Sequence, residues 1–168
     1  MKIEILSKRE KEKIDDFLSE TYGTKFPRSQ FIQPSRERLR IFSGDLSERE
    51  LMILMNTIRI ETIGLYFAFV KKSDKENEKN QDFRLSFDSS FIFKEAKKNV
   101  LDLNEEQMRT WISGQDVDTS GMKDIIQEMN FSYPFILLKY KNEIIGCGKL
   151  TQEKILNFVP KERRIKHF

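Results

Sequence analysis

Residues 133–166, YPFILLKYKNEIIGCGKLTQEKILNFVPKERRIK, decide the fold class of this 168-residue chain. The stretch opens with a continuous apolar run at 133–138, which is typical of a buried strand. A polar turn at 141–143 leads into a second apolar strand at 144–150. Two such strands joined by a short polar loop predict a β-hairpin.

Positive side chains follow the hairpin and alternate with apolar side chains. The basic residues are Lys149, Lys154, Lys161, Arg163, Arg164 and Lys166, interleaved with Ile155, Leu156, Phe158, Val159 and Ile165. This pattern predicts a sheet edge that can lie along a phosphate backbone while it is anchored in a core. A solvated basic tail has the same pattern, so the residues alone leave both interpretations open.

Three segments resemble parts of a PUA domain, the RNA-binding module named for pseudouridine synthases and archaeosine transglycosylases. Residues 146–149 (GCGK) and 154–161 (KILNFVPK) resemble its last strands, and the K-x-x-N-x-x-P-K element is similar to one in the PUA-like C-terminal domains of RNA cytosine-5 methyltransferases. Residues 100–117 resemble the start of the same domain, with a strand, a helix and a glycine turn at Gly114. Asn104 and Gln107 predict a cap at the start of this helix, and Trp111 on the helix is expected to face the core, with the other domain as the alternative. Asp116, just after this turn, does not favour phosphate binding.

The N-terminal half resembles the pre-PUA domain of small archaeal and eukaryotic ribosome-assembly proteins. The two resemblances imply an α+β fold, in which a pre-PUA-like α/β domain (1–98) packs on a PUA-like β-barrel (99–168). They also imply an RNA-binding surface formed by Gly114, Lys139, Lys149, Lys154, Asn157, Lys161, Arg163 and Arg164.

The N-terminal half has its own local signals. Two capping boxes, Ser7 to Glu10 and Ser47 to Glu50, predict helices that run to about residues 21 and 56, the second with a mostly buried apolar set at 51–55. The longest predicted strand is 57–72, with a turn or bulge expected near Gly64, and a solvated loop covers 71–81. Residues 88–90 (DSS) are expected to cap a helix at 91–98.

Three arginines at alternate positions, Arg36, Arg38 and Arg40, predict one basic face of a strand. Pairing with Glu37 and the acidic first helix is one interpretation, and a contact with RNA or protein is the other. Like charges crowded on one strand face repel each other unless a partner neutralises them.

Composition excludes several classes of protein. Apolar residues make up 38% of the chain and charged residues 34%, and the net charge is only +3, so a polyanion site requires local clustering. The single cysteine excludes an intramolecular disulfide, and no apolar run approaches the ~20 residues that span a bilayer. We expect a cytoplasmic protein that does not bind membranes.

No convincing catalytic constellation is present in the sequence. Glycine-rich nucleotide loops are missing, and one cysteine (Cys147) with one histidine (His167) falls short of a zinc site. Cys147, between two glycines, is expected to pack as a small apolar residue and not to act as a nucleophile. The expected function is non-catalytic binding of rRNA or tRNA, without cofactor or metal. The alternatives are a protein–protein adaptor in ribosome assembly and the substrate-binding subunit of an RNA-modifying enzyme, with a methyltransferase or assembly proteins as partners.

Overall fold

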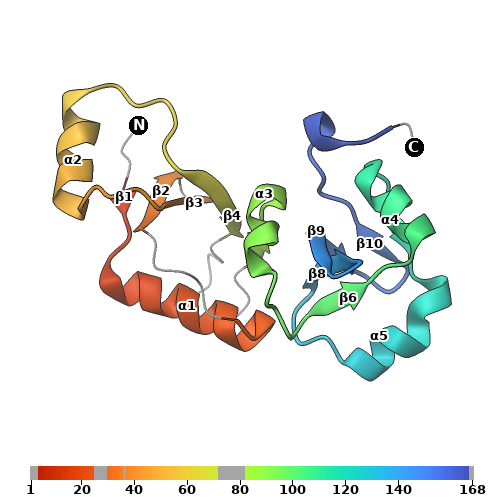
Figure 1. Ribbon diagram of the computed structural model, residues 1–168. Coiled ribbons are helices and arrows are strands. Elements are labelled where there is room, and N and C mark those ends of the chain that lie inside the picture. The colour runs from red at the N-terminus through yellow and green to blue at the C-terminus, as the bar shows by residue number, and fades with distance from the viewer. Residues whose placement is uncertain (1–3, 25–29, 36, 72–81, 167–168) are drawn as a thin grey trace.

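The computed structural model describes residues 4–24, 30–35, 37–71 and 82–166, which form two five-stranded sheets with helices around them (Figure 1). The first sheet is antiparallel in the order β1-β2-β3-β4-β5. Its strands are β1 (Glu4–Ile5), β2 (Gln30–Ser35), β3 (Arg38–Phe42), β4 (Leu65–Lys71) and β5 (Asp82–Leu85). The expected α+β class is confirmed.

The second sheet has the order β6-β8-β9-β10-β7, with one parallel pair, β6 and β8. Its strands are β6 (Val100–Asp102), β7 (Val117–Asp118), β8 (Phe135–Tyr140), β9 (Glu143–Leu150) and β10 (Lys154–Leu156). The predicted hairpin is therefore confirmed as β8 and β9. The expected β-barrel is wrong, because the short edge strands β6 and β7 do not pair with each other and the sheet stays open over the described residues.

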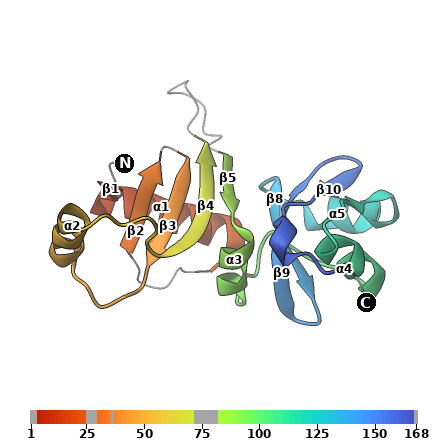
Figure 2. The ribbon, with the colours of Figure 1, turned by 90° about the horizontal axis from the view of Figure 1, so that it is seen from above.

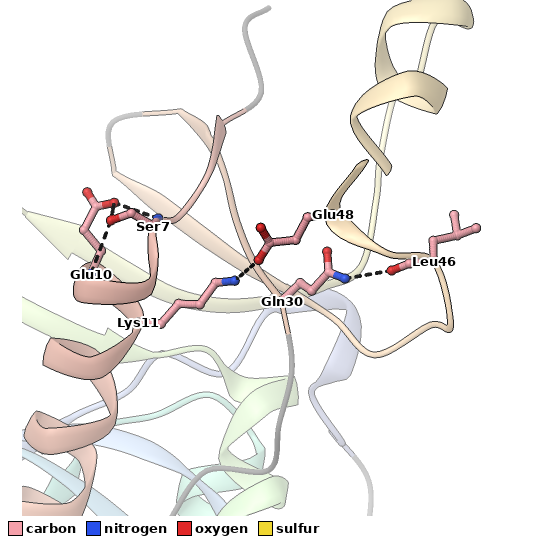
Figure 3. Close-up of polar contacts among 6 residues, drawn as sticks. All are labelled: Ser7, Glu10, Lys11, Gln30, Leu46 and Glu48. Carbon is pink, nitrogen blue, oxygen red and sulfur yellow. Dashed lines mark hydrogen bonds and ion pairs between the residues drawn. The ribbon is translucent and has the colours of Figure 1, made fainter. Parts of the chain in front are cut away.

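Local capping signals place the first two helices. Both capping boxes are formed, at the starts of α1 (Lys8–Tyr22) and α2 (Glu48–Thr57), and Gly23 in the left-handed conformation ends α1. Figure 3 shows the Ser7 box together with an ion pair between Lys11 and Glu48. In the same view Gln30 Nε2 donates to the Leu46 carbonyl at 2.7 Å, so both α1 and β2 hold the segment that enters α2.

Three expectations from the sequence are wrong in the N-terminal half: the buried apolar set at 51–55, the strand at 57–72 and the helix at 91–98. In α2 only Leu51 is buried, whereas Ile53 is 55% exposed, because the helix stands at the end of the sheet and not over it (Figure 1). Residues 58–64 are irregular, so β4 begins only at Leu65.

The expected helix at 91–98 is replaced by α3 (Phe87–Ser90) and a 3-10 turn, η1 (Phe91–Phe93). The cap lies earlier than expected, since the Ser86 side chain accepts from the Ser89 amide. Arg36, loop residues 72–81 and His167 lie outside the described residues.

The remaining helices belong to the C-terminal half. They are α4 (Glu105–Ile112), η2 (Ser120–Met122), α5 (Lys123–Met129) and η3 (Lys161–Arg163). The predicted capping box of α4, Asn104 with Gln107, is formed. None of the helices in the described ranges has the length and apolar character to cross a membrane.

The two sheets share a core. One apolar cluster joins α1 and the first sheet to one face of the second sheet, and it includes Leu18, Tyr22, Phe67, Phe135 and Cys147. A second cluster covers the other face of the second sheet, with Trp111, Ile136 and Ile155 among its members. Tyr22 also donates to the Phe135 carbonyl across the junction at 3.1 Å. The halves therefore pack as one body, and the boundary at 98/99 stays a prediction.

Candidate nucleic-acid interface

Trp111 supports the C-terminal surface from inside. The side chain has no exposed area, which confirms its predicted core position, and its Nε1 donates to the Ile145 carbonyl at 3.0 Å. A Cβ atom at Gly146 or Gly148 would lie 2.8 or 3.0 Å from the indole. The two glycines of the Gly-Cys-Gly motif therefore let β9 lie directly against the Trp111 ring.

Cys147, between these glycines, faces the shared core. Burial raises the pKa of its thiol to about 12, so the thiol stays protonated at neutral pH. Nucleophilic chemistry requires the thiolate. The structure thus agrees with the packing role of Cys147 and offers no thiolate nucleophile at this position.

The structure brings Gly114 and Arg164 together. Gly114 follows the end of α4 with φ +89°, and a Cβ atom there would lie 2.2 Å from Arg164 Nε. Arg164 Nε donates to the Val159 carbonyl at 3.0 Å, and the Ile165 amide donates to the Ile112 carbonyl at 3.0 Å. The glycine turn is thus the surface against which the C-terminal segment is held.

Asn157 uses its side chain inside the protein. Its Nδ2 donates to the carbonyls of Trp111 at 2.6 Å and Gln115 at 2.9 Å, and its Oδ1 accepts from the Val159 amide at 2.8 Å. These bonds fasten the segment after β10 to the turn after α4. They occupy both amide hydrogens, so a direct contact of Asn157 with RNA stays a prediction that the geometry does not favour.

Asp116 and Lys154 neutralise each other next to this turn. Lys154 Nζ lies 2.7 Å from Asp116 Oδ2, and the backbone amide of Asn157 donates to Asp116 Oδ1 at 2.9 Å. The hydrogen bond from Lys154 and the one from the Asn157 amide hold the pKa of the Asp116 carboxyl below its usual value. The acidic residue after Gly114 therefore has a partner within the protein, and Lys154 is less available to bind an external phosphate.

Lys139 and Lys149 lie at opposite ends of the hairpin. Lys139 pairs in register with Ile144, near the hairpin turn, and its Nζ is 3.6 Å from an Asp102 oxygen. Lys149 pairs with Phe135 at the other end, with its Nζ 5.4 Å from the Phe135 ring centroid. The eight predicted residues therefore do not form one patch, and Lys139 is separate from the rest.

Ion pairing divides the predicted cations into two groups. Lys139, Lys154 and Arg163 each have a carboxylate partner; for Arg163 it is Asp88 of α3 at 3.4 Å. Lys149, Lys161 and Arg164 have no ion-pair partner among the described residues. These three positive charges are the ones that remain available to an external anion.

Sequence reasoning missed Arg84 of β5. Its guanidinium carbon lies 4.0 Å from the centroid of Phe158 and 5.4 Å from that of Phe69. Phe158 in turn contacts Phe135, with ring centroids 6.3 Å apart. The alternation of Phe83, Arg84 and Leu85 shows that Arg84 faces away from the core, but no signal in the sequence places it against a residue 74 positions later.

No group of three or more potential histidine, cysteine, aspartate or glutamate ligands occurs within the described parts of the chain.

Comparisons with known proteins find similarity in the C-terminal half. Residues 98–165 match the family described as the methyltransferase RsmF PUA domain. The chain is similar to ribosomal RNA small subunit methyltransferase F of Vibrio campbellii (33% identity over 66 residues, 39% of this chain and 13% of that protein). It is also similar to the Vibrio atlanticus protein with the same name (33% over 64 residues, 38% and 12%). The match thus spans about one eighth of the length of these curated relatives.

Proposed function

We propose that this protein, a PUA-domain protein similar to RNA cytosine-5 methyltransferases over residues 98–165, is a non-catalytic RNA-binding protein. Its RNA would be ribosomal, with transfer RNA as the other structured candidate, because the relatives are named as ribosomal RNA methyltransferases. Binding would place the protein, or an RNA-modifying partner, on the RNA in the cytoplasm without a cofactor.

The observation that carries the proposal is the position of Arg164. Its side chain lies against the Gly114 turn without a carboxylate partner among the described residues, and exposed Lys161 follows Pro160 in the same C-terminal segment. Phosphate oxygens are suitable partners for such cations, and contacts with phosphates position a protein on RNA. Lys149 is linked to this segment through Phe135 and Phe158.

The test is a titration of rRNA and tRNA fragments at several salt concentrations. We expect the log of the affinity to fall linearly with the log of the salt concentration, and Lys161→Glu with Arg164→Glu to weaken binding and flatten this line by about 0.7 to 0.9 for each lost phosphate contact. Lys13→Glu with Lys97→Glu changes the net charge equally at exposed sites and should have a smaller effect. Absence of wild-type binding at low salt would refute the proposal.

A second candidate function is a protein–protein adaptor in ribosome assembly. The observation in its favour is the exposed apolar surface on and around α2: Met52 is 54% and Ile53 55% exposed, and Leu46, Ile58 and Leu65 are also exposed. Exposed apolar groups of this kind mark interaction sites when they are contiguous. This candidate predicts that a partner protein is retained after nuclease treatment and is lost with Ile53→Ser. If that partner is an RNA methyltransferase, the protein serves as its substrate-binding subunit.

A further inference from the structure

The two faces of the first sheet differ in character. One face is covered by α1 and belongs to the shared core (Figure 1). Figure 2 looks onto the other face, with α1 behind the strands and β5 beside the second sheet. Side chains directly opposite each other in an antiparallel pair project on the same side. Their register therefore identifies the residues on this second face.

Arginines and aromatic residues alternate across this face. Arg38 of β3 lies opposite Phe69 of β4, and Phe69 lies opposite Arg84 of β5. Arg40 lies opposite Tyr66 in the same sheet. We call these five residues the arginine–aromatic face. All five are half-buried or exposed.

Contacts join this face into one surface and connect it to the C-terminal half. The guanidinium carbon of Arg38 is 5.9 Å from the Tyr66 ring centroid, and that of Arg84 is 5.4 Å from Phe69. Arg84 also lies 4.0 Å from the Phe158 centroid. Phe158 leads through Phe135 to Lys149. Phe135 is itself buried, so the face meets the C-terminal half at Phe158, which lies in the same segment as Lys161 and Arg164.

Carboxylates do not pair with the arginines of this face among the side chains that the structure describes. Arg40 donates to the carbonyls of Ile63 and Gly64, and none of the three arginines has an ion-pair partner within the ranges that the structure describes. Burial and then the neighbouring charge of Arg38 lower the pKa of Arg40. The acidic residues of α1 do not pair with these arginines, because α1 covers the opposite face of the first sheet.

We propose that the arginine–aromatic face binds a single-stranded segment of RNA that continues from the C-terminal surface, with phosphates at the arginines and bases stacked on Tyr66 and Phe69. This inference rests on the proposed function and extends it to the N-terminal half. Single-stranded nucleic acid is bound by cations that follow the backbone and by aromatic rings on which bases stack. Both groups occur here side by side, and an apolar protein partner would leave three arginine charges unpaired.

The first experiment compares two double variants in titrations with a fluorescent twelve-nucleotide oligouridylate at several salt concentrations. Arg38→Met with Arg84→Met removes two charges but keeps apolar stems that can pack on the rings. We expect the slope of log affinity against log salt to fall by about 1.4, at roughly 0.7 for each lost contact. Arg9→Met with Arg49→Met, at exposed positions on α1 and α2, removes the same charge and should leave the slope close to wild type.

The stacking part is tested by Phe69→Ala, which should weaken binding roughly tenfold if a base stacks on this ring. Ultraviolet crosslinking of the wild-type protein gives a readout that does not depend on the stability of any variant. Mass spectrometry should find the uridine adduct on residues 60–71, the tryptic peptide that carries both aromatic residues.

The outcomes separate this inference from the proposed function. If wild type binds RNA and Lys161→Glu with Arg164→Glu weakens it, while the arginine-to-methionine pair binds as wild type, the RNA site is confined to the C-terminal half and the inference is overturned. Should that pair lower the melting temperature, the crosslink decides, and its absence from residues 60–71 overturns the inference. Failure of wild type to bind any RNA removes both proposals.

Discussion

The two sheets differ in how many of their faces are covered. In β8, residues 135–138 are all buried, because the shared core lies on one side and α4 with Trp111 on the other. In β3 and β4 one face is buried and the other presents arginines and aromatic rings. A sheet covered on both sides can bind a partner only at its edges and turns, whereas β3 to β5 of the first sheet keep side chains of one face accessible. Ligand contacts in the two halves should therefore depend on different kinds of residue.

The largest expected effect is that of replacing Trp111, which packs on one of the two covered faces of the second sheet. Trp111→Ala should lower the free energy of unfolding by about 4 kcal/mol, because it leaves a large cavity against β9. Tyr66→Ala on the open face should cost only about 1 kcal/mol. Chemical denaturation of both variants measures the difference, and equal losses would mean that the two faces are equally packed.

Next in size is the loss of the Asn157 hydrogen bonds, which tests whether this residue holds the turn or reads RNA. Asn157→Ala should cost about 2 kcal/mol of stability, since it removes three partly buried or exposed hydrogen bonds that fasten the segment after β10 to the turn after α4. Asn157→Asp keeps the size of the side chain but cannot donate to the two carbonyls, so it should be no more stable than Asn157→Ala. A variant pair with wild-type melting temperatures and lost RNA affinity would restore the direct-contact interpretation.

A smaller effect, dependent on pH, is expected at Asp116. Its pKa is lowered in the folded protein by Lys154 and the Asn157 amide, so the ionised carboxylate contributes stability above the usual aspartate pKa and loses it as pH falls through the folded-state pKa. Asp116→Asn should therefore cost about 1 kcal/mol at pH 7.

Denaturation of wild type and Asp116→Asn between pH 7 and pH 2 measures this contribution. The difference in stability between the two proteins should shrink below about pH 4, near the usual aspartate pKa. A difference that does not change with pH would contradict an ionic role for Asp116.

The smallest effect is expected on α2, where the apolar residues contact little of the protein. Ile53→Ser should change the free energy of unfolding by less than about 0.5 kcal/mol, because the side chain is already 55% exposed. Leu51→Ser is the matched control: Leu51 lies two residues earlier, on the opposite face of the helix, and is fully buried, so this change should be strongly destabilising. A large loss for Ile53→Ser would show that this surface is packed in solution.

Signals between near neighbours in the chain predicted local structure well. Ser7, Ser47 and Asn104 each start a helix where a capping box was expected, and the hairpin of β8 and β9 forms around its polar turn. Such features succeed because a cap or a tight turn is satisfied by residues three or four positions away. The expected helix at 91–98 failed because Ser86, and not the Asp88-Ser89-Ser90 group, provides the cap.

The sequence by itself determined the helix starts, the hairpin, the burial of Trp111 and the resemblance to a PUA domain. Only the tertiary structure decided which cations are available: it paired Lys154 with Asp116 and Arg163 with Asp88, and it left Arg164 on the Gly114 turn. It also set Arg84 against Phe158 across the junction. The physical reason is that charge pairing and ring contacts depend on distances in space between residues 38 to 75 positions apart, which only the pairing of the strands and the docking of the two sheets fix.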